Sequence, residues 1–109
     1  MPANDKISDL QFRYDNPELG TSGKYHRIQA FAGPNQAHVG EMLWTSKRIS
    51  NILVGGQFQR RGVATSMWNE GHRLASENAR IPAPKHSSDR TNAGDAWARA
   101  VGGRVPRRS

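Results

Sequence analysis

Residues 49–64 constrain the fold more than any other part of the chain. An apolar, strand-like run ends at Val54, two glycines and a polar turn follow, and a helical pattern begins near Gly62. The first backbone N–H groups of a helix have no internal partner, and the helix dipole favours negative charge there. A strand, a glycine-containing basic turn and a helix start therefore predict a site for a phosphate or pyrophosphate group.

The same turn carries a family resemblance. It resembles the Q/R-x-x-G-x-G/A signature of the GNAT acyl-CoA acyltransferases through the residues Gln59-Arg60-Arg61-Gly62-Val63-Ala64. The preceding Val54 and Phe58 are similar to the apolar strand end and the aromatic residue that come before the loop in that family. In overall pattern the chain resembles short GNAT-like proteins of bacteria and their phages.

The resemblance implies acetyl-CoA as the acyl donor and direct transfer of its acetyl group to an amine, without a metal. In the family, backbone N–H groups of the loop hold the coenzyme A pyrophosphate, and the preceding strand pairs with the pantetheine arm. Carried over to this chain, the strand contacts are Ile52, Leu53 and Val54, and the phosphate cradle is Gln59, Arg60, Arg61, Gly62, Val63 and Ala64. The alternative is an ordinary basic surface turn, with Arg60 and Arg61 solvated and Gly62 a turn residue.

The catalytic acid and base usual in the family are both missing. The acid is a Tyr on the last helix, four residues before a closing Gly-Phe; here that position is Ala98, ahead of Gly102-Gly103. The base is often a Glu on the fourth strand, but the corresponding position is near Arg48, and residues 49–56 contain no carboxylate. The resemblance therefore leaves open a GNAT-like module that binds coenzyme A without turnover.

Two residues remain as candidate catalytic groups. Glu41 lies mid-strand beside apolar residues, where burial would raise its pKa toward that of a usable base; the alternative is an edge charge that faces solvent. His86 follows a proline-rich stretch, and its ordinary pKa suits proton transfer near neutrality; the alternative is a loop histidine. The other histidines show no metal-ligand spacing, and Asp89-Arg90-Thr91 favours helix capping over catalysis.

Composition narrows the class of protein. The 109 residues suit one domain, expected to comprise a frayed N-terminus (1–8), a GNAT-like domain (9–103) and a basic C-terminal tail (104–109). The lack of cysteine excludes disulfides and thiolate chemistry. No apolar run approaches the ~18 residues of a membrane span and no signal peptide is recognisable, so we expect a cytoplasmic protein without membrane contact.

The formal net charge of +7 predicts a polyanionic partner. Coenzyme A is one such partner and nucleic acid is another. No helix-turn-helix, zinc finger or aromatic RNA-binding signature accompanies the charge. A small basic nucleic-acid-binding protein is therefore the third hypothesis, beside the acyltransferase and the silent coenzyme A-binding module.

Hydrophobic periodicity predicts an α+β fold with a mostly antiparallel central sheet and a crossover helix after the phosphate-binding turn. The expected strands are 10–14, 25–32, 37–45 and 49–54, the expected helices are about 61–78 and 92–101, and residues 80–86 could start a fifth strand. Val39, Glu41 and Leu43 should share one strand face. The last helix should bury Ala93, Trp97, Ala100 and Val101.

The N-terminal region departs from the family pattern. Only a loop follows the first strand, so the two helices usual there are missing or reduced to a turn. That leaves an open acceptor side, or one completed by a second subunit in a homodimer.

Overall fold

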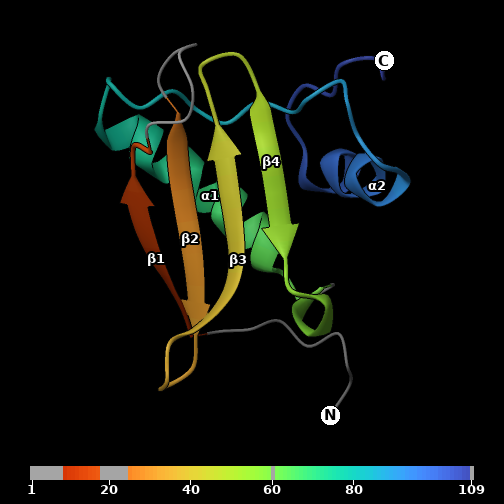
Figure 1. The fold of residues 1–109 in the computed structure, drawn as a ribbon. Helices are drawn as coiled ribbons and strands as arrows, with labels where there is room; N and C mark the ends of the chain where they lie inside the picture. The colour runs from red at the N-terminus through yellow and green to blue at the C-terminus, as the bar shows by residue number, and fades with distance from the viewer. Residues whose placement is uncertain (1–8, 18–24, 60, 109) are drawn as a thin grey trace.

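The computed structural model describes residues 9–17, 25–59 and 61–108. Within these ranges the chain has an α+β fold, a four-stranded antiparallel sheet with two α-helices (Figure 1). The elements in chain order are β1 (Leu10–Asp15), β2 (His26–Ala32), β3 (Ala37–Trp44), β4 (Ile49–Val54), the short 3-10 helix η1 (Gly56–Phe58), α1 (Val63–Glu77) and α2 (Asn92–Val101).

The sheet is a meander in which the strands lie side by side in chain order. A tight turn joins β2 to β3, where Gln36 N–H donates to the Gly33 carbonyl at 3.1 Å. Gly33 has a φ of 77°, a left-handed conformation that glycine adopts without strain. The four strands and the two helices expected from periodicity are confirmed, with ends shifted by at most two residues.

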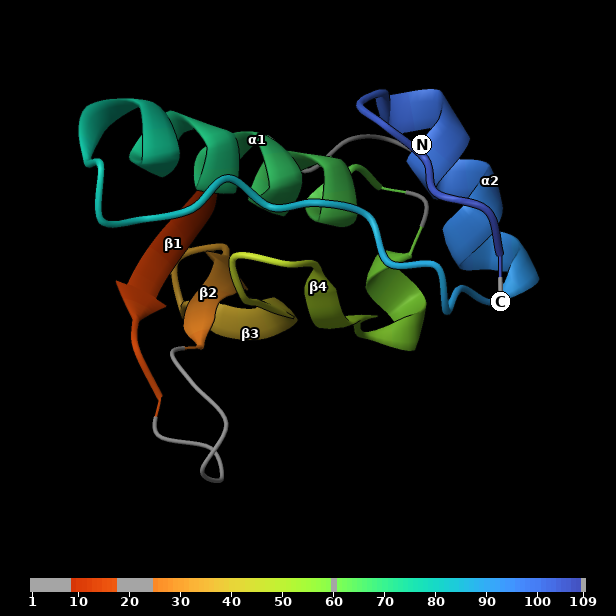
Figure 2. The same cartoon turned by 90° about the horizontal axis from the view of Figure 1, so that it is seen from above.

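Helix α1 covers one face of the sheet and contacts all four strands (Figure 2). It buries Val63, Met67, Trp68 and Gly71, which recur at helical spacing. Opposite them, Ile28, Met42 and Trp44 are fully buried. Burial of each such large apolar side chain contributes roughly 1.5–3 kcal/mol, so this interface is the core of the molecule.

Trp44 anchors the chain that follows α1 to the sheet. Its indole Nε1–H donates to the Pro82 carbonyl at 2.7 Å. Its ring lies 5.5 Å from that of His26, and the His26 Nδ1 is 2.6 Å from the Tyr14 hydroxyl. His26 is therefore a packing residue, as its lack of metal-ligand spacing predicted.

A β-bulge changes the expected faces of β3. Ala30 pairs with Gly40 and Phe31 pairs with His38, so Val39 is the extra residue. Val39 is buried in the core, whereas Glu41 and Leu43 are half-buried on the face away from α1. The prediction that Val39 shares a face with Glu41 is wrong, because the bulge breaks the two-residue alternation between them.

Residues 80–86 do not form the fifth strand that the sequence suggested. One backbone hydrogen bond, from Ile49 N–H to the Lys85 carbonyl at 2.7 Å, links this extended segment to β4. Pro82 and Pro84 have no N–H group with which to continue a ladder. The segment instead crosses near one end of the sheet and leads to α2, which lies beyond the β4 edge (Figure 1).

The buried stripe of α2 is rotated from the predicted one. Ala98 is buried and Trp97 and Val101 are half-buried, but Ala93 and Ala100 are exposed. The rotation follows from the position of α2 beside α1. Trp97 packs edge-on against Trp68, with ring centroids 5.7 Å apart, and this contact selects the neighbouring Ala98 for burial.

The second face of the sheet is open in the described part of the chain, since neither α1 nor α2 covers it (Figure 2). Leu53 is 57% exposed on this face. The loop where the family places two helices falls largely on residues 18–24, outside the described ranges. Neither described helix is long and apolar enough to cross a bilayer.

Close packing of α1 on Pro84 yields a stability prediction. A Cβ at Gly71 would lie 2.5 Å from the Pro84 Cγ and 3.2 Å from the Met42 Cε. Gly71→Ala should lower the free energy of unfolding by about 1–3 kcal/mol through overpacking, although alanine alone would favour the helix by about 1 kcal/mol. Urea unfolding measures this, with exposed Asn69→Ala as the control that should not destabilise. A more stable Gly71→Ala protein would contradict the packing.

Candidate functional site

The turn after β4 is built on a left-handed glycine. Gly55 N–H donates to the Val39 carbonyl at 3.0 Å, η1 then turns the chain, and the Gln59 side-chain amide donates to the Val54 carbonyl at 3.3 Å. Gly62 has a φ of 83° and is the N-cap of α1. Residues with a Cβ rarely adopt this conformation, so a glycine is required where the turn enters the helix.

In the described part of the chain, the N-terminus of α1 has an N-cap residue, Gly62, but no side-chain cap. No side chain accepts a hydrogen bond there, and the first turn contains no acidic residue. The first helical hydrogen bond runs from Ser66 N–H to the Gly62 carbonyl at 2.9 Å. The N–H groups of Val63, Ala64 and Thr65 therefore have no acceptor within the helix, which is the arrangement that favours a bound anion.

The turn contains two basic residues, Arg60 and Arg61, and the Arg61 side chain is half-buried. Arg60, which the resemblance also placed in the phosphate cradle, lies outside the described residues.

The outer edge of β4 presents backbone groups beside this turn. Since Gly55 N–H bonds to β3, the alternation of an antiparallel ladder points the backbone groups of Ile52 and Val54 away from β3. The Gln59 side chain occupies the Val54 carbonyl. In the described part of the chain, the bond between Ile49 and Lys85 is the one backbone hydrogen bond that crosses this edge. Ile52 can therefore pair through its backbone with an extended ligand.

We name the hollow beside the first half of β4 the edge cavity. It has a volume of about 180 Å³ and lies between β4 and the start of α2. Its lining includes Ile49, Ile52, His86, Thr91 and Trp97. The edge cavity therefore lies beside the start of β4, the unpaired edge runs along the strand, and the turn follows the end of the strand.

His86 lines the edge cavity but is held rigidly. It is 5% exposed and stacks on Trp68, with ring centroids 4.1 Å apart and an interplanar angle of 4°. Its Nε2 lies 2.8 Å from the Gly102 carbonyl oxygen. A carbonyl only accepts, so Nε2 carries the proton, and Nδ1 is the atom left for proton transfer. His86 lies outside any helix or strand, as the alternative of a loop histidine has it, but its ring is buried.

Glu41 lies on the other side of the sheet from His86. It is half-buried on the open face, in register with Leu53 of β4. Its charge contributes to raising the pKa of Arg27, for which the hydrogen-bonded Asp15 carboxylate is the main cause. The structure therefore does not bring the two predicted catalytic residues together, because α1 and the stacked His86 lie against the opposite face.

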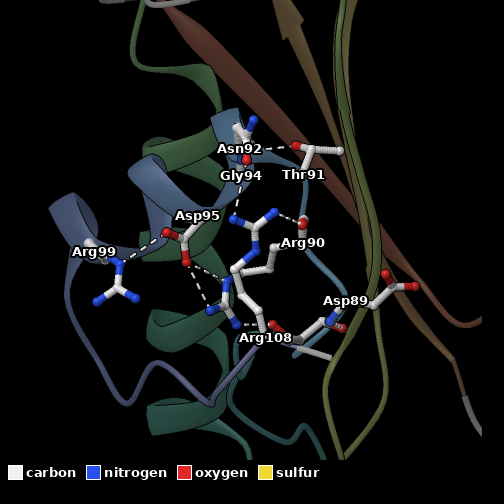
Figure 3. Close-up of polar contacts among 9 residues, drawn as sticks. Asp89, Arg90, Thr91, Asn92, Gly94, Asp95, Arg99 and Arg108 are labelled. Carbon is white, nitrogen blue, oxygen red and sulfur yellow. Dashed lines mark hydrogen bonds and ion pairs between the residues drawn. The ribbon is translucent and has the colours of Figure 1, made fainter.

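Sequence reasoning missed a buried ion-pair network that supports the edge cavity (Figure 3). The Arg90 side chain is 5% exposed, and its guanidinium donates to Asp95 at 2.9 and 3.0 Å and to the Ser87 carbonyl. The hydroxyl of Thr91 accepts from Gly94 N–H at 3.0 Å, which confirms helix capping here. An Asp five residues after an Arg was the signal in the sequence.

The basic tail also contacts this network. Arg108 donates to the Asn92 side chain at 3.2 Å and to the Arg90 carbonyl at 2.9 Å (Figure 3). These contacts tie the chain after α2 to the start of that helix.

Comparison with family models, curated proteins and solved structures gave no significant match for this chain. Within the described residues, no three His, Cys, Asp or Glu side chains gather as metal ligands do. The chemistry of the site therefore has to be inferred from the residues described above.

The Arg90 network yields a pH-dependent prediction. Hydrogen bonds from Arg99 and then Arg90 lower the pKa of Asp95. A lowered folded-state pKa stabilises the fold above the ordinary Asp value of about 3.9, and this stabilisation is lost as the pH falls through the folded-state pKa. Asp95→Asn should therefore lower the Tm by several degrees at pH 7, and the difference from wild type should shrink below pH 4.

Thermal unfolding between pH 2 and 7 measures this difference. Glu77→Gln is the matched control, since it removes one partner of an exposed ion pair with Arg73 and should change the Tm little. Equal effects of the two substitutions would show that the Arg90 network does not stabilise the fold.

Proposed function

We propose that this chain binds an acyl-CoA, with the pyrophosphate at the N-terminus of α1 and the pantetheine arm along the outer edge of β4, and transfers the acyl group to an amine. The observation that carries the proposal is the left-handed Gly62 at a helix start without a side-chain cap, one turn after a strand whose outer edge is largely unpaired.

The phosphate end of the ligand would be held by the main chain. The N–H groups of Val63, Ala64 and Thr65 point out of the helix start and carry the positive end of its dipole. Gly62 has no Cβ, which leaves room for a phosphate oxygen close to the backbone. The bond from Gln59 to the Val54 carbonyl holds the turn in this shape before a ligand arrives.

The extended arm of the ligand would add to the sheet as a further strand does. Its amide groups can pair with the backbone N–H and carbonyl of Ile52, a mode of recognition in which main-chain hydrogen bonds supply affinity. From there the arm runs toward Ile49 and enters the edge cavity, which would hold the thioester near His86.

Transfer requires one bond to form and one to break. The amine nitrogen attacks the thioester carbonyl, the C–N bond forms, the C–S bond breaks, and the thiolate of coenzyme A leaves. A base must take the proton from the amine. An acceptor that enters the edge cavity would use His86 as the base, whereas an acceptor on the open face would use Glu41.

A silent coenzyme A-binding module is the second candidate, and the burial of Ala98 favours it. This residue, at the position of the usual Tyr acid of the family, is 0% exposed and cannot donate a proton. One nitrogen of His86 is also committed to the Gly102 carbonyl. Saturable acetyl-CoA binding without transfer to any amine in a broad panel would establish this second function.

The cradle can be tested by Gly62→Val. The substitution should abolish acetyl-CoA binding in a calorimetric titration, because a branched Cβ blocks the phosphate and strains the left-handed backbone. Gly33→Val is a matched control: Gly33 has nearly the same φ, 77° against 83°, but lies in the β2–β3 turn. Gly33→Val should retain wild-type affinity. Equal affinity of a folded Gly62→Val protein would exclude the proposed cradle.

The side from which the amine enters can be tested by His86→Gln and Glu41→Gln. The Gln amide can still donate to the Gly102 carbonyl but cannot take a proton. If the acceptor uses the edge cavity, His86→Gln should reduce kcat by about 10²–10⁴-fold with unchanged acetyl-CoA affinity, and Glu41→Gln should not. The reverse pattern would place the acceptor on the open face. Full activity in both variants would exclude both residues as the base.

A further inference from the structure

A second hollow, which we name the basic cavity, adjoins the edge cavity at His86. Its volume is about 510 Å³, and His86 lines both cavities. Among the described residues, the lining of the basic cavity contains no carboxylate. Four cationic side chains line it: Lys47, Arg48, Lys85 and Arg104.

These cations come from three separate parts of the chain. Lys47 and Arg48 lie between β3 and β4, Lys85 lies in the extended segment, and Arg104 follows α2. In the described ranges, none of the four forms an ion pair with a carboxylate. The fold therefore gathers like charges at one place without neutralising them.

Four other arginines of the described chain have carboxylate partners. Arg27 pairs with Asp15, Arg73 with Glu70 and Glu77, and both Arg90 and Arg99 with Asp95. Four acidic residues thus pair with arginines that do not line the basic cavity. A concave surface lined by one sign of charge focuses its field and attracts ligands of the opposite sign.

The wall of the basic cavity is rigid. His86 stacks on Trp68, and its Nε2–H bonds to the Gly102 carbonyl. Gly102 and Gly103 have φ values of 94° and 83°, and a Cβ at Gly103 would lie 3.2 Å from the Trp68 ring. This close approach of the backbone to Trp68 positions the following Arg104 at the cavity.

We propose that the basic cavity binds a small, multiply charged phosphate-type anion such as a pyrophosphate or a phosphate ester. Its volume is in the range of small-ligand sites, about 300–1,000 Å³. It is distinct from the α1 N-terminus, because Lys47 and Arg48 precede β4 and the turn follows it, a separation of roughly 20 Å along the strand. The inference stands independently of acyl-CoA binding at the turn.

A small anion fits better than a nucleic acid strand. Single-stranded nucleic acid is held by aromatic faces on which bases stack. Here Trp68 is 6% exposed, and the His86 ring covers one of its faces. The cavity therefore offers charge and depth without a free stacking platform.

The test is a calorimetric titration with pyrophosphate at moderate salt. Arg48→Gln/Arg104→Gln should weaken binding about tenfold or more, because two charge-assisted contacts are lost. Arg13→Gln/Arg80→Gln removes the same charge elsewhere and should retain the wild-type affinity. Equal affinities of the two double variants would overturn the proposal.

Two further measurements distinguish binding at the basic cavity from binding at the turn, and a small anion from nucleic acid as the ligand. Gly62→Val should leave this pyrophosphate binding intact, whereas loss in Gly62→Val but not in Arg48→Gln/Arg104→Gln would place the anion at the turn and overturn the proposal. A short single-stranded DNA should bind more weakly than pyrophosphate. Tighter DNA binding that is lost in Arg48→Gln/Arg104→Gln would overturn it in favour of a nucleic-acid site.

His72 supplies a readout at the cavity itself. Burial and then the charge of His86 lower the pKa of His72, which also lines the basic cavity. A bound anion favours the protonated ring, so saturating pyrophosphate should raise the pKa of His72 in an NMR titration. An unchanged pKa would contradict binding at this position.

Discussion

The stacking of His86 on Trp68 is the contact on which the described architecture beyond the sheet depends. Trp68 belongs to α1, His86 belongs to the segment that returns from it, and the hydrogen bond from His86 to Gly102 reaches the chain after α2. Trp97 closes the cluster edge-on. Three segments that are distant in sequence thereby share one buried aromatic wall, whose residues line both the edge cavity and the basic cavity.

Among the described residues, charged side chains near the aromatic wall fall into two groups, a buried cation that is paired and exposed cations that are not. The guanidinium of Arg90 is buried, and a buried cation is tolerated only when it is paired, so Asp95 and the Ser87 carbonyl satisfy it. Because Asp95 of α2 pairs with Arg90, its carboxylate does not neutralise the cations at the basic cavity. The cations around the basic cavity stay exposed to water, where their mutual repulsion is weak and a ligand can still meet them. Part of the positive charge of the chain is thus gathered at one cavity.

Local pattern predicted most elements, because each rests on short-range chemistry. Alternation placed the four strands, the run from Val54 to Gly62 placed the start of α1, and Thr91 placed the start of α2. The errors occur where a distant contact intervenes. The bulge at Val39 depends on pairing with β2, and the face that α2 buries depends on the packing of Trp97 against α1. The proline segment does not form a strand because Pro82 and Pro84 lack N–H groups, and the Pro82 carbonyl accepts from the distant Trp44.

The sequence by itself determined the helix start after a glycine turn, since a left-handed residue and an uncapped N-terminus depend only on neighbours along the chain. It also marked Glu41 and His86 as groups able to move protons. Only the tertiary structure decided that these two lie on opposite sides of a sheet, and that Lys47, Lys85 and Arg104 meet at one cavity. The physical reason is that residues far apart in sequence come together according to which faces of the helices and the sheet bury apolar area. The spacing of residues along the chain does not determine which faces these are.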